Sequence, residues 1–322
     1  MKNCHVIVYV YKAVSCMKFI QFRRISRIKM ASQDTMWSFG YGSNMDVKAV
    51  ETKKKVKIID HTAAILKGWK LAFNLSGIPL VEPAYANVTK GDPTDEVHGV
   101  AFCMTKDSIE QMDRVESGYN KAQVTLEAYD GRKLDGFVYV NKPSAVSTET
   151  HQPSSRYVGV LVKGAKQAGL SKSYIENLQK TEVYKPSAET LKLRESLPKP
   201  DDLPAISVEE LAKHDGKDEK FPTRVAVLGY VMQPGRSWFG THRGRDRTTR
   251  FLMQYHGLPL DDNEDFGKPP YPLLDSLTGD EKEYISRWMD HYLSSSNGKA
   301  VGYVKEFREQ QKSGQSVYQL PK

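Results

Sequence analysis

A proline-rich run divides the chain into two parts. Ser196–Pro204 (SLPKPDDLP) holds three prolines in nine residues and has no apolar periodicity. Proline lacks a backbone N–H and has a fixed φ, so such a run continues neither a helix interior nor a central strand. At roughly 150 residues per domain, the length of 322 residues accommodates one domain on each side of this linker. We predict an N-terminal extension over 1–33, a first domain over 34–190, a linker over 191–204, a second domain over 205–310 and a tail over 311–322.

Of the formal net charge of +8, +7 belongs to the N-terminal extension. Residues 1–29 hold seven of the 47 Lys and Arg residues and none of the 39 Asp and Glu residues, so the rest of the chain has 40 basic and 39 acidic residues. A body so close to neutrality lacks the net basic charge that attracts nucleic acids and anionic membranes. We therefore expect neither of them as a partner.

The extension leaves two alternatives for localisation. It is rich in Arg and Lys and free of acids, as mitochondrial transit peptides are, or it is an upstream extension ahead of Met30. Its longest uncharged run, Asn3–Tyr11, has nine residues, whereas a membrane span needs about 20. The body has one cysteine, Cys103, which excludes an internal disulfide there and fits a reducing compartment. We expect a cytoplasmic protein, or a mitochondrial one if the extension is a transit peptide.

Hydrophobic periodicity predicts a mixture of strands and helices. Apolar segments bounded by Gly, Asn and Asp indicate strands, and apolar residues at a spacing of 3.6 indicate helices. Strands are expected over 36–41, 65–75, 97–104, 124–129, 134–140, 224–231 and 301–304. Helices are expected over 107–115, 171–180 and 279–293, with a short helix after Ser207. Both kinds of element occur in both halves of the chain.

The most distinctive local motif is Phe39–Asn44 (FGYGSN), at the end of the first predicted strand. Two glycines that flank a tyrosine allow the backbone to approach a ligand closely, and successive N–H groups in such a turn form a nest for an anion. Ser43 and Asn44 add side-chain donors. A plain strand-to-loop turn is the alternative interpretation. A phosphate loop is not indicated, because neither GxxxxGK[ST] nor GxGxxG occurs here.

A second motif places a carboxylate at the end of a predicted helix. Glu116 follows the helix over 107–115 and precedes a turn that contains Gly118 and Tyr119. Burial beside an apolar helix end raises the pKa of a carboxyl group and suits it to general acid–base work. The alternative is a solvated glutamate, which is the usual state of a charged residue.

Four segments in this order resemble the gamma-glutamylcyclotransferase family over residues 36–185. They are FGYGSNM at 39–45, VHGVAFCM at 97–104, MDRVES at 112–117, and Tyr157 followed by GAKQAGLSKSYIENL at 164–178. The resemblance implies a small mixed barrel with helices around a cavity. It also implies a lyase reaction in which the amine of a γ-glutamyl group attacks its own γ-carbonyl, releasing 5-oxoproline and an amino acid or amine.

The resemblance assigns roles to particular residues. Glu116 stands at the family's catalytic position, as general acid and base. The residues expected to hold the substrate are Tyr41, Gly42, Ser43 and Asn44, for the glutamyl α-carboxylate, and Tyr119, as a cavity-lining hydroxyl. No metal or organic cofactor is implied. The turn after Glu116 is shorter than is usual in the family, so γ-glutamyl amino acids, γ-glutamyl amines and glutathione all remain open as substrates.

Residues 205–309 resemble a cytochrome b5-like domain of the membrane-associated progesterone receptor type. The matching segments are ISVEELAKHDG at 206–216, VAVLGYV at 225–231, GRD at 244–246 and LDSLTGDEKEYISRW at 274–288. The predicted fold is therefore a gamma-glutamylcyclotransferase-like barrel followed by a cytochrome b5-like α+β domain.

Haem binding by this second domain is not favoured. The resemblance places the haem-ligating tyrosine of that branch at Phe239, which has no ligating atom, and His242 or His256 would have to substitute for it. We expect a module that has lost haem and contacts a protein partner, with Trp238, Phe239 and Arg243–Arg245 as its contact surface. The alternative is a haem-binding or adaptor protein whose cyclotransferase-like half is idle. The oligomeric state stays open.

Overall fold

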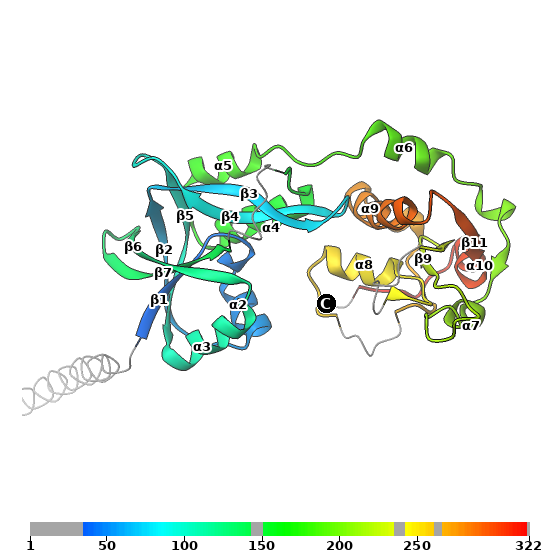
Figure 1. Ribbon diagram of the computed structural model, residues 1–322, viewed down its shortest axis with the longest axis horizontal. Helices are drawn as coiled ribbons and strands as arrows, with labels where there is room; N and C mark the ends of the chain where they lie inside the picture. Colours follow the sequence, from blue (N-terminus) through cyan, green and yellow to red (C-terminus); the bar gives the residue numbers. More distant parts are fainter. Residues whose placement is uncertain (1–34, 143–150, 235–241, 261–265, 321–322) are drawn as a thin grey trace, which may run out of the picture. The chain divides into compact units, whose positions relative to one another are not determined.

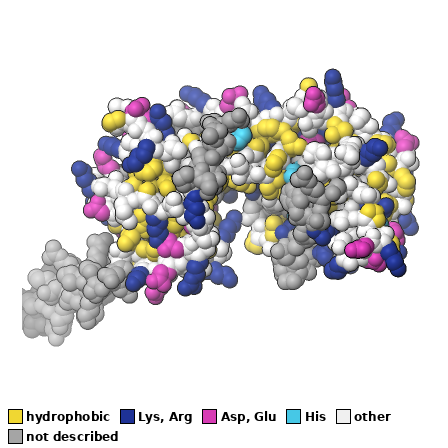
Figure 2. All heavy atoms as spheres, in the orientation of Figure 1, with side chains coloured by type: hydrophobic (Ala, Val, Ile, Leu, Met, Phe, Trp, Pro, Cys, Tyr) yellow, Lys and Arg dark blue, Asp and Glu magenta, His cyan; other side chains and the backbone are white. Residues whose placement is uncertain are grey.

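The protein forms two compact units. The structure is a computed structural model that describes residues 35–142, 151–234, 242–260 and 266–320. Unit 1 contains the described chain up to Leu71, together with Val88–Lys142 and Gly164–Tyr174. Unit 2 contains Ala72–Asn87, the described residues of 143–163, and those from Ile175 onward. On the face shown in Figure 2, Lys and Arg side chains lie among Asp and Glu side chains in both units.

Unit 1 is built on a closed five-stranded barrel (Figure 1). Around the barrel the strands are β1 (Thr35–Gly40), β5 (Glu96–Thr105), β2 (Ile58–Lys67), β6 (Tyr119–Ala128) and β7 (Lys133–Asn141). β1 pairs antiparallel with β5 and parallel with β7, and this mixed pairing closes the sheet. Closure leaves no strand edge with unpaired backbone groups. The predicted mixed barrel is therefore present.

Side chains fill the barrel and helices pack beside it. Eight successive residues of β5, Val97–Met104, are buried, as is typical of a strand covered on both faces. α3 (Lys106–Val115) directly follows β5, and the Thr105 hydroxyl caps it by accepting from Ser108 N. α2 (Val47–Lys54) and α3 lie side by side (Figure 1). A glycine is needed at position 99, because a Cβ there would lie 2.3 Å from the carbonyl oxygen of Gly40.

Two predicted strands are wrong, because each is broken by a turn at a glycine. The strand expected over 65–75 ends at Lys67, and β3 (Trp69–Ile78) begins after Gly68, whose φ is +73°. β3 pairs with β4 (Glu82–Lys90). The strand expected over 224–231 is a hairpin of β9 (Val225–Val227) and β10 (Tyr230–Met232), with Gly229 at φ +78°. In both places the apolar residues on either side of the turn form one continuous strand-like pattern in the sequence.

A buried histidine links the barrel to the helix α5 (Lys172–Gln179). His98 of β5 is 6% exposed, and its Nε2 lies 3.0 Å from Glu96 Oε1. The Tyr129 hydroxyl accepts from Ser171 N at 3.0 Å and shares a hydrogen bond with His98 Nδ1. Because Nε2 donates to Glu96, Nδ1 is the acceptor in the neutral ring. Ser171 in turn caps α5, as predicted, by accepting from Tyr174 N. The ring of Tyr174 stacks on His98 at a centroid distance of 4.6 Å.

Tyr129→Phe is expected to lower the free energy of unfolding of unit 1 by about 1–3 kcal/mol. The substitution leaves the buried His98 Nδ1 without its donor, and an unsatisfied buried acceptor costs about this much. Thr125→Val is the matched control, because it also removes one hydroxyl, which donates to Asp135 on the exposed surface, and should cost under about 0.5 kcal/mol. Urea unfolding of the two variants measures the difference, and equal midpoints would contradict a structural role for the Tyr129 hydroxyl.

The C-terminal part of unit 2 combines a sheet of order β8-β11-β10-β9 with helices, in agreement with the predicted α+β class. Its further elements are β8 (Ala205–Ile206), α7 (Val208–Ala212), α8 (Thr248–Tyr255), α9 (Gly279–Ser295), β11 (Ala300–Val304) and α10 (Lys305–Ser313). α9 confirms the helix predicted over 279–293, and it begins with a capping box between Thr278 and Glu281. In the core, Phe251 of α8 stacks on Trp288 of α9 at a centroid distance of 4.3 Å.

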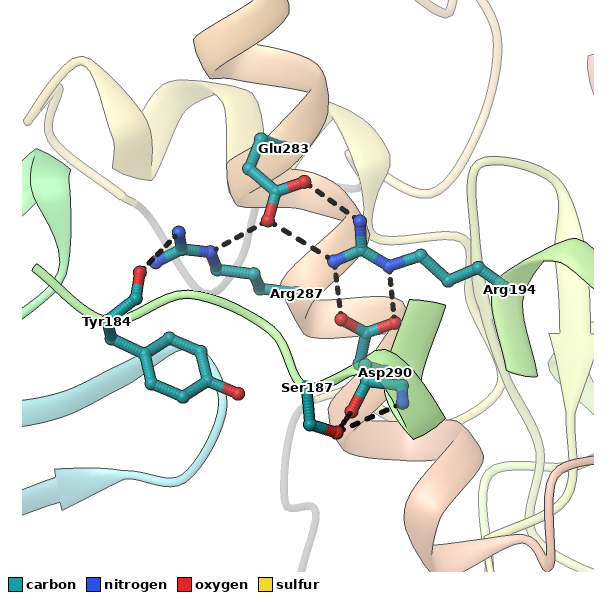
Figure 3. Close-up of polar contacts among 7 residues, drawn as sticks. Tyr184, Ser187, Arg194, Glu283, Arg287 and Asp290 are labelled. Carbon is teal, nitrogen blue, oxygen red and sulfur yellow. Dashed lines mark hydrogen bonds and ion pairs between the residues drawn. The ribbon is translucent and has the colours of Figure 1, made fainter. Parts of the chain in front are cut away.

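The predicted linker over 191–204 contains structure of its own. It begins within α6 (Ala188–Glu195) and includes a 3-10 turn at Pro200–Asp202. α6 buries none of its residues, but Arg194 fixes it to α9 (Figure 3). The Arg194 guanidinium donates to Asp290 at 2.7 and 2.5 Å and to Glu283 at 2.8 Å. In the same network, Arg287 donates to Glu283 and to the carbonyl oxygen of Tyr184.

Candidate active site

Three elements of unit 1 meet at the carboxylate of Glu116. Glu116 is the C-cap of α3, where its N–H donates to Met112 O, and only 8% of its surface is exposed. Asn44 lies in the 3-10 turn η2 (Ser43–Met45), and its Nδ2 donates to Glu116 Oε1 at 3.2 Å. Lys54, the last residue of α2, forms an ion pair with the same oxygen. The two predicted motifs, 72 residues apart in the chain, therefore lie in contact.

The two oxygens of the Glu116 carboxylate have different surroundings. Asn44 Nδ2 and Lys54 Nζ both contact Oε1. No donor among the residues that the structure describes contacts Oε2. An ionised carboxylate accepts about four hydrogen bonds, so Oε2 retains its capacity to take a proton or to accept from a ligand. One oxygen is thus held in place, and the other is available for chemistry.

Lys54 was missed by the sequence analysis. It lies in the run Lys53–Lys55, and a run of three lysines resembles a solvated helix end. Its spacing from Val50 could have indicated that Lys54 is partly buried. Residues four apart share a helix face, and Val50 is an apolar residue of α2. Val50 is 1% exposed, and the Lys54 side chain is 14% exposed, whereas Lys53 and Lys55 lie on the surface.

The Tyr41–Asn44 turn packs tightly at the end of β1. A Cβ at Gly40 would lie 2.8 Å from the carbonyl oxygen of Asn44, so only glycine fits at that position. The Tyr41 hydroxyl donates to the carbonyl oxygen of Tyr139 at 2.9 Å, which directs this side chain to the barrel wall. Gly42 accepts from Met45 N at 3.1 Å, and Ser43 is exposed.

Two phenols lie within the electrostatic influence of Glu116. Burial, and then the charge of Glu116, raise the pKa of Tyr119, the first residue of β6. The pKa of Tyr139 is raised further, by burial, by its hydrogen bond to Asp113, and by the charges of Asp113 and Glu116. The Tyr139 hydroxyl donates to Asp113 Oδ1 at 2.6 Å, and Lys121 Nζ lies 2.7 Å from Asp113 Oδ2. Both phenols therefore stay protonated as hydrogen-bond donors. Tyr139 was not predicted, because only the barrel pairing brings it to Asp113.

A cavity of about 270 Å³ lies at the other end of α2. Its lining residues come from the start of α2, from β2 and β5, and from the end of α4 (Ser155–Gln167): Met45, Asp46, Val47, Lys48, His61, Ala63, Val100, Gln167 and Ala168. The cavity begins at Met45, directly after Asn44, and its lining includes neither Glu116 nor Lys54.

In unit 2, both histidines considered as haem ligands are in contact with protein side chains. His242 Nδ1 shares a hydrogen bond with the Tyr292 hydroxyl, and its ring contacts Phe251 and Trp288 edge-on. His256 Nε2 lies 2.6 Å from Glu281 Oε1. Trp238 and Phe239 lie outside the described residues. Within the described ranges, no cluster of three or more His, Cys, Asp and Glu residues is arranged to hold a metal ion.

Comparison with known proteins gives matches that cover up to about half of the chain. Residues 96–178 match the model of the AIG2-like family. The chain is 29% identical over 145 residues to a gamma-glutamyl cyclotransferase of Claviceps purpurea (strain 20.1), covering 42% of this chain and 65% of that protein. It is 27% identical over 150 residues to the gamma-glutamylcyclotransferase of Bos taurus, covering 45% of this chain and 77% of that protein. A solved structure named gamma-glutamyl cyclotransferase is 25% identical, with a TM-score of 0.40, covering 50% of this chain and 99% of that chain.

The chain thus spans just under two thirds of the length of the Claviceps relative. None of the helices in the described residues has the length and apolar character that a membrane span requires. The segment that matches the family model includes Glu116 and Tyr119 but not the Tyr41–Asn44 turn or Lys54. Residues 96–178 are therefore similar to the AIG2-like, gamma-glutamylcyclotransferase family.

Proposed function

We propose that the first domain is a gamma-glutamylcyclotransferase that converts a γ-glutamyl compound into 5-oxoproline and a free amine or amino acid. The observation that carries the proposal is the contact between Asn44 of the Tyr41–Asn44 turn and the buried carboxylate of Glu116. The similarity of residues 96–178 to the AIG2-like family supports it. So do the relatives, which are named gamma-glutamyl cyclotransferases.

In the proposed mechanism, Glu116 moves one proton. Its free oxygen, Oε2, takes a proton from the α-ammonium of the glutamyl group, and the resulting amine attacks the γ-carbonyl carbon. The C–N bond to the leaving group then breaks as the protonated Glu116 returns this proton to the departing nitrogen. The ring nitrogen gives up its second proton to the released amine, which leaves as an ammonium group. General acid–base catalysis of this kind contributes about 10²–10⁴-fold to a rate. No other reactant is needed, and the carboxylate is regenerated.

The turn at Tyr41–Asn44 would hold the glutamyl α-carboxylate and fix the geometry of attack. Backbone N–H groups at Gly42 and Ser43, with the Ser43 hydroxyl, are donors suited to an anion. Holding the amine near the γ-carbonyl favours ring closure, and well-oriented intramolecular reactions gain roughly 7–11 kcal/mol in this way. Tyr119 would supply a protonated hydroxyl near Glu116, because burial and the charge of Glu116 raise its pKa.

For residues 205–310 we propose a cytochrome b5-like module that contacts a protein partner and does not bind haem. The protein contacts of His242 and His256 support a role for both residues without iron. Titration of the purified protein with haemin tests this proposal: we expect no saturable Soret band, and a one-to-one Soret titration would contradict it.

A substrate panel tests the proposed activity. The full-length protein is incubated with γ-glutamyl amino acids, γ-glutamyl amines and glutathione, and 5-oxoproline is measured by liquid chromatography. We expect 5-oxoproline from at least one of the three classes, in proportion to enzyme concentration and time. If the folded protein forms no 5-oxoproline from any class, the cyclotransferase proposal is wrong.

A further inference from the structure

We propose that Lys54 binds the carboxylate of the amino acid that the reaction releases, and that it thereby selects γ-glutamyl amino acids over γ-glutamyl amines. The inference rests on the proposed function and names the substrate class of the same site. It starts from a cation that lies directly against the proposed acid–base carboxylate.

The position of Lys54 is set by the end of α2. Val50, one turn earlier, is buried and anchors this face of the helix. Lys55 adopts the left-handed conformation at φ 53° and ends the helix, so Lys54 is its last helical residue. The other cations near the site have different partners: Lys121 pairs with Asp113, and Lys142 donates to the carbonyl oxygen of Ser117. Among the residues that the structure describes, Lys54 is the cation in contact with Glu116.

The ammonium group of Lys54 has donors to spare. A lysine ammonium carries three N–H donors, and Glu116 Oε1 is one acceptor. The Lys54 side chain is only 14% exposed, so water has restricted access to the remaining donors. A carboxylate on the substrate would accept from them, and hydrogen bonds between charged groups are the strong ones in proteins.

The reaction itself changes the charge balance at Lys54. In the resting site, the positive charge of Lys54 is balanced by the Glu116 carboxylate. When Glu116 takes the proton of the substrate ammonium, that carboxylate becomes neutral and Lys54 lacks its counterion. An anionic group on the substrate would restore the balance while the tetrahedral intermediate exists. Stabilisation that appears only at this stage raises the rate of the chemical step.

The covalent structure of a γ-glutamyl amino acid brings the carboxylate of its leaving group close to Lys54. Glu116 must return its proton to the departing nitrogen, so that nitrogen lies within hydrogen-bond reach of Glu116. In a γ-glutamyl α-amino acid, the carboxylate of the leaving group is two bonds from this nitrogen and lies near Lys54. A γ-glutamyl amine has no such group. In glutathione, the corresponding carboxylate is one residue further away, about 3.8 Å along the chain.

Two matched substrates isolate the carboxylate. γ-Glutamyl-L-alanine and γ-glutamylethylamide differ in one position, where a carboxylate replaces a hydrogen. The measured quantity is the ratio of kcat/KM for the two substrates, from 5-oxoproline formed by the full-length protein. Lys54→Met removes the charge at nearly constant length, Lys54→Arg retains the charge, and Lys53→Met is the control on the exposed face of the same helix.

We expect the wild-type protein to favour γ-glutamyl-L-alanine by at least about tenfold. Lys54→Met should reduce the alanine-to-ethylamide ratio by about 10–100-fold, the usual value of a hydrogen bond to a charged group. Lys53→Met should leave the ratio unchanged, and Lys54→Arg should restore most of it. If Lys54 has only a structural role, Lys54→Met should lower kcat/KM equally for both substrates and leave their ratio unchanged.

Each contrary result has a distinct meaning. The role of Lys54 in specificity is overturned if the wild-type protein has similar kcat/KM for both substrates, or if Lys54→Met lowers kcat/KM equally for both. In either case the cyclotransferase proposal stands. If wild-type protein forms 5-oxoproline from neither substrate nor from any member of the wider panel, the proposed function fails, and the inference fails with it.

Discussion

Glu116→Gln is expected to lower the rate of 5-oxoproline formation by about 10²–10⁴-fold, the usual contribution of a general acid–base residue. Glutamine has nearly the same shape and can still accept the hydrogen bond from Asn44, but it neither takes nor returns a proton. The protein should remain folded, because the substitution changes no apolar packing at the end of α3. The measurement is the steady-state rate on the best substrate of the panel, with circular dichroism as the test of folding.

Glu110→Gln provides the matched control for this variant. Glu110 lies on the same helix, α3, and is exposed. The Glu110→Gln variant loses the same charge at a position away from the Asn44 and Lys54 contacts. Its activity should therefore stay within about twofold of wild type, because surface substitutions have small effects. If Glu116→Gln also retained wild-type turnover, Glu116 would not be the acid–base residue.

Arg194→Met is expected to lower the free energy of unfolding of unit 2 by about 3–5 kcal/mol, the usual cost of removing one partner from a buried ion pair. Arg194 gives Asp290 two hydrogen bonds (Figure 3). Asp290 is only 2% exposed. The substitution leaves this carboxylate inside the unit without its cation. It also releases α6, which buries none of its residues and is fixed to α9 by Arg194.

The destabilisation of Arg194→Met should depend on pH. Burial raises the pKa of Asp290, and the hydrogen bond and charge of Arg194 oppose that shift. Without Arg194, the folded-state pKa of Asp290 rises further above the value of about 3.9 expected for an unfolded chain. A carboxyl with a raised folded-state pKa contributes stability below the unfolded pKa and loses it as the pH rises through the folded pKa. The deficit relative to wild type should therefore increase from acidic to neutral pH.

Amide hydrogen exchange along α9 measures this effect locally, because it reports the opening of the helix that carries Asp290. Lys192→Met is the control, since Lys192 is an exposed basic residue of the same helix α6, and it should change protection by less than about 0.5 kcal/mol. Equal protection of α9 in wild type and Arg194→Met would show that the Figure 3 network contributes no stability.

The sequence located the two halves of the candidate site but not their contact. Asn44 was predicted from a glycine-rich turn and Glu116 from a helix end, and each motif is local. Their contact depends on the pairing of β1 with β5, which carries α3 alongside η2. Tyr139 was missed for the same reason, since its partner Asp113 lies 26 residues away. Lys54 was hidden in a run of lysines whose outer members are exposed.

The errors in the predicted fold have local causes. Gly68 and Gly229 lie in segments rich in apolar residues, so the predicted strands continued through the two turns at which these glycines have positive φ values. α6 was not predicted, because it buries none of its residues: Leu193 packs only partly buried against the core, and Arg194 joins the helix to α9 by ion pairs. α3 and α9 were predicted correctly, because each has buried apolar residues at helical spacing and a capped N-terminus.

The most direct measurement of the central claim is a product balance by ¹H NMR. γ-Glutamyl-L-alanine is incubated with the full-length protein, and 5-oxoproline, alanine and glutamate are followed together. We expect 5-oxoproline and alanine to appear at equal rates without glutamate, and we expect both products to form at least about 100-fold more slowly with Glu116→Gln. Release of glutamate with alanine would indicate attack by water in place of ring closure, and it would contradict a cyclotransferase.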